Sequence, residues 1–473
     1  MRVSVVGSGP NGLAAAVMMA RAGHRVVVYE ADASAGGGLK TDRFDGFDGI
    51  FDVCSAVHPM ALASTFFQSF ELSRRIEFLM PEISYAQAIS SRSAVAYRDL
   101  ERTMDELGRS GAGWGRVMKP LIANIDGVRR LSGLDLRLRP STVVSAAVMA
   151  AAVGGFSALR QDARALAAGA TAHAASPFRS LPARFVGAVL AAEAHATGWP
   201  IPRGGSRVIA DALIADLLAH GGEVRTEHRV SDLREIWRPG DVTFLNVGPR
   251  EISRMAGPLL PARYDRRLKR YRYGNAASKV DFVLSAPVPW RDSRLKDAGT
   301  VHIGELERDV SRAEDQARRG RVPDKPYVLL SQPTRLDRTR LPASSSDEVI
   351  WAYAHVPNGS TVDASELITS RIEHFAPGFR DLVIHREARP APFFAAMNPN
   401  FGGGDVLGGR IDVSQFLTRP TMTDLPWTTP LPGVYLASAA TPPGAGVHGM
   451  GGWHAARLAL HRLHQNVPSL GMA

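Results

Sequence analysis

The first thirty residues alternate between apolar, β-branched runs and a helix-forming run. Residues 2–6 and 25–29 are short, apolar and rich in valine, as expected for buried parallel strands. Between them, residues 13–22 are rich in alanine, methionine and leucine, and Gly23 stands where a helix usually receives its C-terminal cap. The pattern predicts a strand, a helix and a second strand at the start of the chain.

A glycine-rich turn joins the first predicted strand to the helix. It consists of Gly7, Ser8, Gly9, Pro10, Asn11 and Gly12. The first glycine permits a tight turn, the second lets the backbone approach a pyrophosphate, and the third lets the helix pack closely on the strand. The amide groups and the dipole of the helix start attract phosphate. Glu30 ends the second strand, where it can accept hydrogen bonds from ribose hydroxyls. This context predicts a dinucleotide site rather than an ordinary glycine turn.

A second glycine-rich segment, at residues 31–41, follows directly and indicates which dinucleotide binds. A nicotinamide-binding unit does not need such a segment, whereas in flavoproteins of the glutathione-reductase type it runs past the ribityl and flavin end of FAD. The chain repeats the strand–GxGxxG–helix arrangement nowhere else. We therefore expect one FAD, contacted here by Ala31, Gly37, Gly38, Leu39 and Lys40.

Length and composition favour a globular protein with two domains. The chain has 473 residues, of which 45% are hydrophobic and 22% charged. Its single cysteine, Cys54, excludes disulfides within the chain, cysteine-based metal sites and a CxxC redox pair. No metal site is expected. One cysteine, and a first strand that starts almost at Met1, favour a cytoplasmic protein.

The net charge of +10 raises the question of an acidic partner. The densest basic cluster spans residues 263–272 and is interleaved with tyrosines. No nucleic-acid-binding motif accompanies it, so we expect no nucleic-acid partner and interpret the cluster as a solvated face. Contact with an anionic membrane surface, at the inner face of the membrane, is the functional alternative.

The middle of the chain loses the strand–helix alternation. Alanine-rich helices are predicted at 141–153, 159–175 and 183–196. The apolar run 143–159 falls short of the ~20 residues of a membrane span, so we interpret it as a core helix or as one wall of an apolar tunnel; peripheral membrane contact stays an alternative. Residues 277–284, 327–332 and 349–356 are predicted strands of an antiparallel sheet.

Two later segments complete a family resemblance. Residues 198–206 read GWPIPRGGS before a predicted helix, and residues 433–438 lead into PPGAGVHGMGG at 442–452. Together with the opening fingerprint and the second glycine segment, they resemble the phytoene desaturase branch of the FAD-dependent amine oxidase superfamily. They are similar to carotenoid desaturases, retinol saturases and the pyridine nucleotide-disulfide oxidoreductase domain-containing protein 2 group.

The resemblance implies an α/β fold: a glutathione-reductase-type, Rossmann-like FAD-binding domain with an inserted α+β substrate domain, which has an antiparallel sheet and a helical cap. The implied FAD-binding domain comprises residues 1–65, 196–262 and 424–473, and the substrate domain comprises 66–195 and 263–423. The resemblance also implies further FAD contacts. The backbone of Val230 would contact the adenine, Asn246, Gly248 and Ala439 would lie at the same site, and free N–H groups of Gly449, Met450 and Gly451 would face the flavin C2 carbonyl.

Two histidines are candidates for catalysis. His58 could orient the substrate or take a proton, although a histidine satisfied by backbone partners is the commoner case. His448 could touch the substrate or simply pack its loop. Cys54 is expected to be a small buried side chain rather than a flavin attachment point. The glycine-rich loop at 398–409 either lines the substrate access or is an ordinary cluster of turns.

The expected activity is a hydride transfer between flavin N5 and a carbon of an apolar small molecule, by C–C desaturation or saturation or by C–N oxidation. Such chemistry needs little acid–base machinery, and the sequence has no HExxH, P-loop or GxSxG motif. Because there is no second nucleotide fold, oxygen, a quinone or another carrier is the expected electron acceptor. A membrane-associated carotenoid desaturase and a non-catalytic flavin-binding scaffold are the alternatives.

Overall fold

A five-stranded parallel sheet collects strands from the start, middle and end of the chain. The structure is a computed structural model that describes residues 1–90, 92–135 and 140–472. The strands are β1 (Arg2–Val6), β2 (Arg25–Tyr29), β9 (Glu223–Arg225), β10 (Val242–Leu245) and β16 (Val434–Leu436), in the order β16-β10-β1-β2-β9. Each neighbouring pair is parallel, and the central strands are buried, as their valine-rich sequences require.

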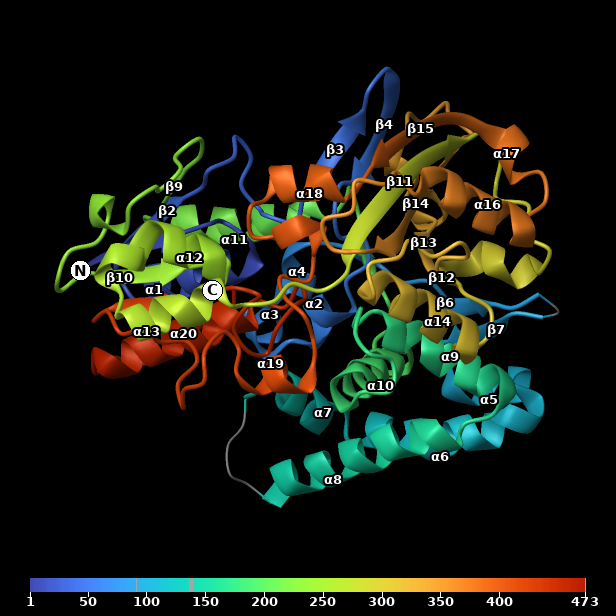
Figure 1. The fold of residues 1–473 in the computed structure, drawn as a ribbon, viewed down its shortest axis with the longest axis horizontal. Helices are drawn as coiled ribbons and strands as arrows, with labels where there is room; N and C mark the ends of the chain where they lie inside the picture. Colours follow the sequence, from blue (N-terminus) through green and yellow to red (C-terminus); the bar gives the residue numbers. More distant parts are fainter. Residues whose placement is uncertain (91, 136–139, 473) are drawn as a thin grey trace.

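The helix after the glycine turn lies at the centre of this layer. Helix α1 (Pro10–Arg21) packs against α11 (Arg207–Ala219) and α20 (Met450–Arg462), which come from the middle and the end of the chain (Figure 1). Gly452 permits the close contact with α20, because a Cβ there would lie 1.8 Å from the carbonyl oxygen of Asn11. The parallel sheet and its helices confirm the predicted Rossmann-like layer.

A seven-stranded sheet forms the second layer. It contains β15 (Val383–Arg389), β11 (Ala276–Leu284), β14 (Glu348–Val356), β13 (Val328–Ser331), β12 (Ala298–Ile303), β6 (Ile83–Ala88) and β7 (Ala94–Tyr97), in this order. Three of these strands were predicted. The three predicted strands pair antiparallel, as expected, and the only parallel pair among the described strands of this sheet is β6–β12. Its alternating residues face α16 (Ser365–Phe375) on one side and a large cavity on the other.

The predicted alanine-rich helices lie beyond this sheet. They are α8 (Pro140–Gly155), α9 (Gln161–Ala172) and α10 (Leu181–Ala196), accompanied by α5 (Leu100–Glu106), α6 (Gly111–Ala123) and α7 (Ile125–Ser132). Figure 1 shows α6 and α8 along the lower edge of the molecule. The helical stretch Pro140–Ala158 is long and apolar enough to cross a membrane, by length and composition alone, and only 28% of its apolar window is buried. This corrects the expectation that the apolar run 143–159 falls short of the length of a membrane span.

The remaining elements are short and connect these layers. They are α2 (Pro59–Ala63), α3 (Thr65–Ser69), α4 (Leu72–Arg75), α12 (Pro249–Ala256), α13 (Ala262–Lys269), α14 (Glu307–Arg318), α15 (Pro333–Leu336), α17 (Phe379–Leu382), α18 (Ala391–Met397), α19 (Val413–Leu417), β3 (Thr41–Phe44), β4 (Phe47–Asp52), β5 (Phe78–Leu79) and β8 (Ile201–Pro202). The basic cluster falls on α13 and the loop after it, where its arginines are exposed.

Candidate functional site

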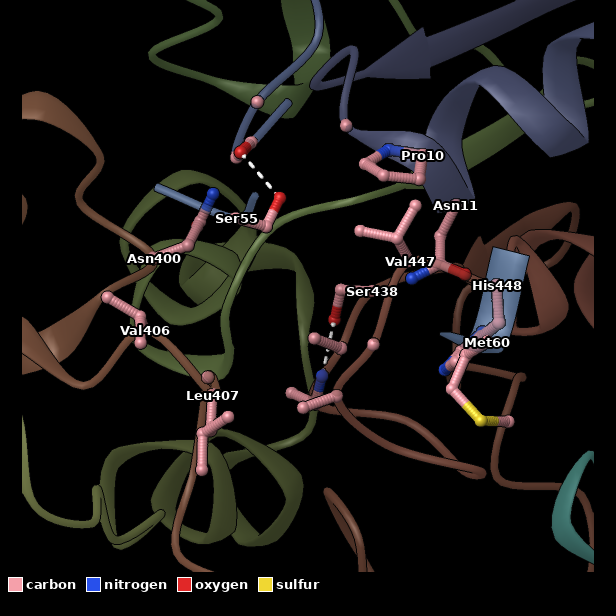
Figure 2. Close-up of a pocket in the computed structure, with 18 of the residues that line it drawn as sticks. Pro10, Asn11, Ser55, Met60, Asn400, Val406, Leu407, Ser438, Val447 and His448 are labelled. Carbon is pink, nitrogen blue, oxygen red and sulfur yellow. Dashed lines mark hydrogen bonds between the residues drawn. The ribbon is translucent and has the colours of Figure 1, made fainter. Parts of the chain in front are cut away.

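One connected cavity of about 1380 Å³ lies between the two sheets. This exceeds the roughly 300–1,000 Å³ typical of a pocket for one small ligand, so there is room for a dinucleotide and a substrate together. Most of the predicted site residues line it: Gly7, Ser8, Gly9, Pro10, Asn11, Glu30, Ala31, Gly37, Gly38, Lys40, His58, Val230, Asn246, Gly248, Ala439, His448 and Met450. Gly12, Leu39, Gly449 and Gly451 do not. Figure 2 shows part of this lining.

The turn before α1 has the shape of a phosphate cradle. Gly7 has a φ of +90°, which favours glycine, and the amide groups of Asn11 and Gly12 have no acceptor in the described part of the chain. Gly12 serves packing, because a Cβ there would lie 2.2 Å from the Gly7 carbonyl oxygen. Pro10 occupies the first turn of the helix, where no N–H is needed. The open amides and the helix start fit a pyrophosphate.

Glu30 holds the two glycine loops together at the edge of the cavity. Its carboxylate accepts hydrogen bonds from the amides of Ser8 (2.9 Å) and Asp32 (3.0 Å). The Ser8 hydroxyl donates to Glu30 and accepts from the amide of Gly36 at 2.9 Å. A carboxylate oxygen can accept more than one hydrogen bond, so Glu30 keeps capacity for a ribose hydroxyl. The residues present therefore fit FAD at this end of the cavity.

The loop at 398–401 also borders the dinucleotide end. Asn398, Pro399, Asn400 and Phe401 line the cavity, and Oδ1 of Asn400 accepts a hydrogen bond of 2.7 Å from the Gly248 amide. The Gly248 amide is thus engaged within the chain. Asn246 donates from Nδ2 to the Gly7 carbonyl at 3.1 Å, which ties β10 to the first glycine turn.

The start of α20 differs from expectation. The Met450 amide donates to Nδ1 of His448 and the Gly451 amide to Oδ1 of Asn11, each at 3.0 Å. The expectation of free N–H groups at these two positions is therefore wrong, because neighbouring side chains accept both. Gly449 lies against Phe66, away from the cavity lining.

His448 is occupied by its own loop. Its Nδ1 accepts from Met450, so the proton sits on Nε2, which donates to the Gly444 carbonyl at 3.2 Å. Both ring nitrogens are engaged, and burial lowers the pKa of His448 to about 4. The geometry matches the loop-packing alternative for this residue.

His58 keeps one nitrogen open. The Ser206 hydroxyl donates its single proton to the Ser55 carbonyl (2.6 Å). It therefore accepts a hydrogen bond from Nε2–H of His58 (2.8 Å). Nδ1 then carries a lone pair, has no partner among the described residues and is not sealed from the cavity that His58 lines. Burial lowers the pKa of His58 to about 4, an effect that Asp52 opposes and Arg340 reinforces. At pH 7 the ring is a neutral hydrogen-bond acceptor.

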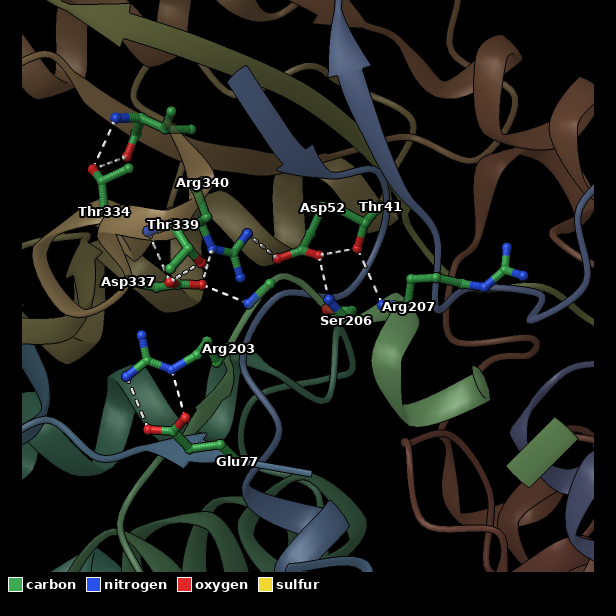
Figure 3. Close-up of polar contacts among 12 residues, drawn as sticks. Thr41, Asp52, Glu77, Arg203, Ser206, Arg207, Thr334, Asp337, Thr339 and Arg340 are labelled. Carbon is green, nitrogen blue, oxygen red and sulfur yellow. Dashed lines mark hydrogen bonds and ion pairs between the residues drawn. The ribbon is translucent and has the colours of Figure 1, made fainter. Parts of the chain in front are cut away.

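A buried ionic network supports His58 and was not predicted. Asp52 accepts from the Ser206 amide (2.7 Å), the Thr41 hydroxyl (2.9 Å) and the Arg340 guanidinium (2.8 Å), as Figure 3 shows. Arg340 also pairs with Asp337 at 3.3 Å, and its side chain is 0% exposed. Burial alone would raise the pKa of Asp52, but Arg340 and the Ser206 amide hold it below its ordinary value.

Lys279 is a second residue that was missed. It lies on β11, is buried, lines the cavity and pairs with Asp281, which also binds Arg389 at 2.8 Å. Burial lowers the pKa of Lys279 and raises that of Asp281, because both charged forms are desolvated. A lysine and an aspartate two residues apart in a β-branched strand share one face, and this signal could have found them.

Several histidines in the interior or at the cavity make stability depend on pH. Burial lowers the pKa of His58 and His448 to about 4 and that of His173 to about 3. Unfolded histidine titrates near 6.5, so the unfolded chain binds protons that the folded chain excludes below that pH. The stabilising effect is complete above pH 6.5 and is lost as the pH falls towards 4, by roughly 3 kcal/mol for each of these histidines.

We expect the free energy of unfolding by urea to fall between pH 7.5 and pH 5. The variant His173→Gln should make this fall shallower, whereas His461→Gln, at an exposed position, should not. An unchanged slope in His173→Gln would contradict a neutral His173 in the folded protein.

The geometry agrees with comparisons with known proteins. Residues 11–253, more than half of the chain, match the family model of the flavin containing amine oxidoreductases. The chain belongs to this family, which consists of FAD-dependent oxidoreductases, and its cofactor is FAD.

Individual relatives are distant. Pyridine nucleotide-disulfide oxidoreductase domain-containing protein 2 of Rattus norvegicus is 22% identical over 311 residues, which cover 56% of this chain and 52% of that protein. The Mus musculus protein of the same name is 22% identical over 309 residues, with the same coverage. The chain thus spans about half the length of the curated relatives it matches.

Solved structures share the whole fold. An oxidoreductase from Methanosarcina mazei has a TM-score of 0.61 at 15% identity, covering 98% of this chain and 100% of that one. Putrescine oxidase bound to putrescine gives 0.57 at 15% identity, with 98% and 100% covered. Cyclohexylamine oxidase from Brevibacterium oxydans gives 0.55 at 12% identity, with 98% and 99% covered. At these identities the likeness establishes the fold alone.

Proposed function

We propose that the protein transfers a hydride between a carbon of an apolar small molecule and flavin N5, to desaturate or saturate a C–C bond or to oxidise a C–N bond. One observation carries the proposal: the cavity at the dinucleotide cradle continues into a corridor whose lining residues on α8 and α10 are all apolar. A mostly apolar pocket with few polar groups is typical of a small-molecule site.

The chain's own residues supply position and a dry environment. Bound FAD provides the electron acceptor, so little acid–base chemistry is asked of the protein. Phe185 and Val189 of α10, together with Met149 of α8, keep water from the corridor. Nδ1 of His58 can hold a neutral N–H or O–H group of a ligand. The charge of Lys279 is balanced by Asp281, so it adds an N–H donor without a net charge.

We further propose that the protein belongs to the phytoene desaturase branch of the family, with the domain division 1–65, 196–262 and 424–473 against 66–195 and 263–423. The similarity to the pyridine nucleotide-disulfide oxidoreductase domain-containing protein 2 relatives supports this branch. Oxygen, a quinone or another carrier is the proposed electron acceptor, because the sequence has a single dinucleotide fingerprint.

Anaerobic spectroscopy tests the activity. The purified protein should be yellow, and apolar candidate substrates should bleach the flavin band in the absence of oxygen. After photoreduction, oxygen or a quinone should restore the band. Recovery with NADP⁺ alone would contradict the proposed acceptor. A flavin that no substrate or reductant bleaches would support the scaffold alternative.

The exposed apolar surface favours one second candidate, a desaturase that takes its substrate from a membrane. Val143 on α8 is 70% exposed and Leu181 on α10 is 67% exposed, and Leu181 lines the mouth of the cavity. The protein should then float with anionic liposomes, and Val143→Asp with Val144→Asp should abolish flotation without loss of bound FAD. Wild-type protein that stays at the bottom of the gradient would exclude this candidate.

A further inference from the structure

The cavity contains a buried arginine that forms no ion pair in the described part of the chain. Arg419 follows α19, is 3% exposed and lines the cavity. No carboxylate of the described residues lies within ion-pair distance of its guanidinium. Asp405 attracts it only from a longer distance, and its oxygens accept hydrogen bonds from backbone amides instead. The other cations beside the substrate corridor are paired: Arg129 binds Glu193 at 2.8 Å, and Lys279 binds Asp281. A buried charge is costly unless an opposite charge accompanies it.

Neutral partners hold the guanidinium in one orientation. The Tyr271 hydroxyl donates to the Gly408 carbonyl (3.0 Å) and accepts from Nε of Arg419 (3.1 Å). The Nη2 group donates to the carbonyls of Gly408 (3.4 Å) and Gly409 (3.3 Å). Nη1 has no hydrogen-bond partner among the described residues, and it is not completely buried. The remaining donors of a fixed, planar fork therefore stay free for a ligand in the cavity.

The distribution of charge around the cavity favours an anion. The acidic residues of its lining are Glu30, Asp32 and Glu251, and all three lie at the dinucleotide end. All lining residues on α8 and α10 are apolar, and α19 lies against α10. A ligand with an apolar body in this corridor and a carboxylate on Arg419 would satisfy both features. A protonated amine would find no counterion in the described lining of this half.

We propose that the substrate is an apolar carboxylic acid, with its hydrocarbon part in the corridor and its carboxylate bound by Arg419. The proposal rests on the proposed function, because it specifies the substrate class of the same site. The FAD pyrophosphate is a second source of the same anionic chemistry, so the experiment distinguishes the two. Guanidinium and carboxylate form strong, geometrically specific hydrogen bonds.

Titration of the FAD-loaded, full-length protein tests the substrate class. Hexadecanoate, 1-hexadecanol and acetate are each titrated, and the perturbation of the visible flavin spectrum gives the Kd. Hexadecanoate should bind at least about tenfold more tightly than 1-hexadecanol, since only the acid neutralises Arg419; acetate, without an apolar body, should bind more weakly still. Equal affinity of the acid and the alcohol would overturn the proposal. The proposal would also be overturned if hexadecanoate did not bind while another substrate bleached the flavin. The proposed function would survive that result.

Variants then assign the anion. Arg419→Gln should raise the Kd of hexadecanoate by about 10–100-fold and leave the Kd values of 1-hexadecanol and of FAD unchanged. Arg419→Lys should retain part of the affinity for hexadecanoate. Arg410→Gln is the matched control, because Arg410 lies in the same segment, pairs with Asp412 at 2.9 Å and does not line the cavity. A weakened FAD affinity with unchanged acid affinity would assign Arg419 to the cofactor phosphate and overturn the proposal. If Arg419→Gln fails to fold, the wild-type comparison of acid and alcohol still decides.

Discussion

Replacing Arg340 by methionine should lower the free energy of unfolding by about 3–5 kcal/mol. Arg340 is 0% exposed and lies between Asp52 and Asp337, which are also buried. Methionine fills a similar volume without a charge, so the variant leaves two carboxylates in the interior without their cation. Removal of one partner of a buried ion pair is far more costly than its replacement as a whole, because the remaining charge is desolvated and uncompensated. Urea unfolding monitored by tryptophan fluorescence gives the value.

The control is an ion pair of the same type at the surface. Arg43 and Asp48 lie 3.1 Å apart with side chains 73% and 75% exposed. Arg43→Met should change stability by less than about 1 kcal/mol, because water screens this pair. The triple change Arg340→Met, Asp52→Asn and Asp337→Asn should recover much of the loss. A loss at Arg340 no greater than at Arg43 would contradict the structural role of the network.

Replacing Gly9 by valine should abolish FAD binding in a protein that still folds. Gly9 has φ −64° and ψ 169°, a conformation that other residues adopt, so the substitution strains no backbone. It lines the cradle, however, and a Cβ there would already lie 2.9 Å from Nδ2 of Asn246. The valine side chain would occupy the space that the fold leaves for the pyrophosphate, and we expect the Kd of FAD to rise by at least about 100-fold, or ~2.7 kcal/mol.

Fluorescence titration of the apoprotein with FAD measures the effect, and circular dichroism checks the fold. Gly154→Val is the matched control, because a Cβ at this helix position has no atom within 4 Å and Gly154 does not line the cavity. The control should bind FAD normally. Retention of FAD by Gly9→Val would contradict the assignment of this turn to the cofactor. The melting temperature of Gly9→Val should also stop responding to added FAD, since ligand stabilisation depends on binding.

Sequence reasoning reached the dinucleotide end because its signals are local. The strand, the glycine turn and the helix follow each other within about twenty residues, and each position carries a steric or electrostatic requirement of its own. The same reasoning failed at the start of α20, where the Met450 and Gly451 amides are accepted by His448 and Asn11. Asn11 lies 440 residues away from Gly451, and no local pattern reports such a partner.

The chemistry of the substrate half also depends on distant partners. His58 is a candidate from its type and position, but its tautomer follows from Ser206, 148 residues further on. Lys279 lies on a predicted strand, yet its role as a neutralised donor follows from its pairing with Asp281 inside the sheet. The sequence of α8 alone is equally compatible with a core helix. Only the packing of the other elements leaves its apolar side chains exposed.

By itself, the sequence determined the Rossmann-like unit, the FAD cradle and the helical character of the middle region, because periodicity and turn chemistry act over a few residues. Only the tertiary structure decided which polar groups around the cavity are satisfied and which stay open. Arg419 is one of many arginines in the sequence. It becomes notable when the fold buries it beside the cavity with only neutral hydrogen-bond partners, since the energy of a charge depends on its surroundings rather than on its neighbours in the chain.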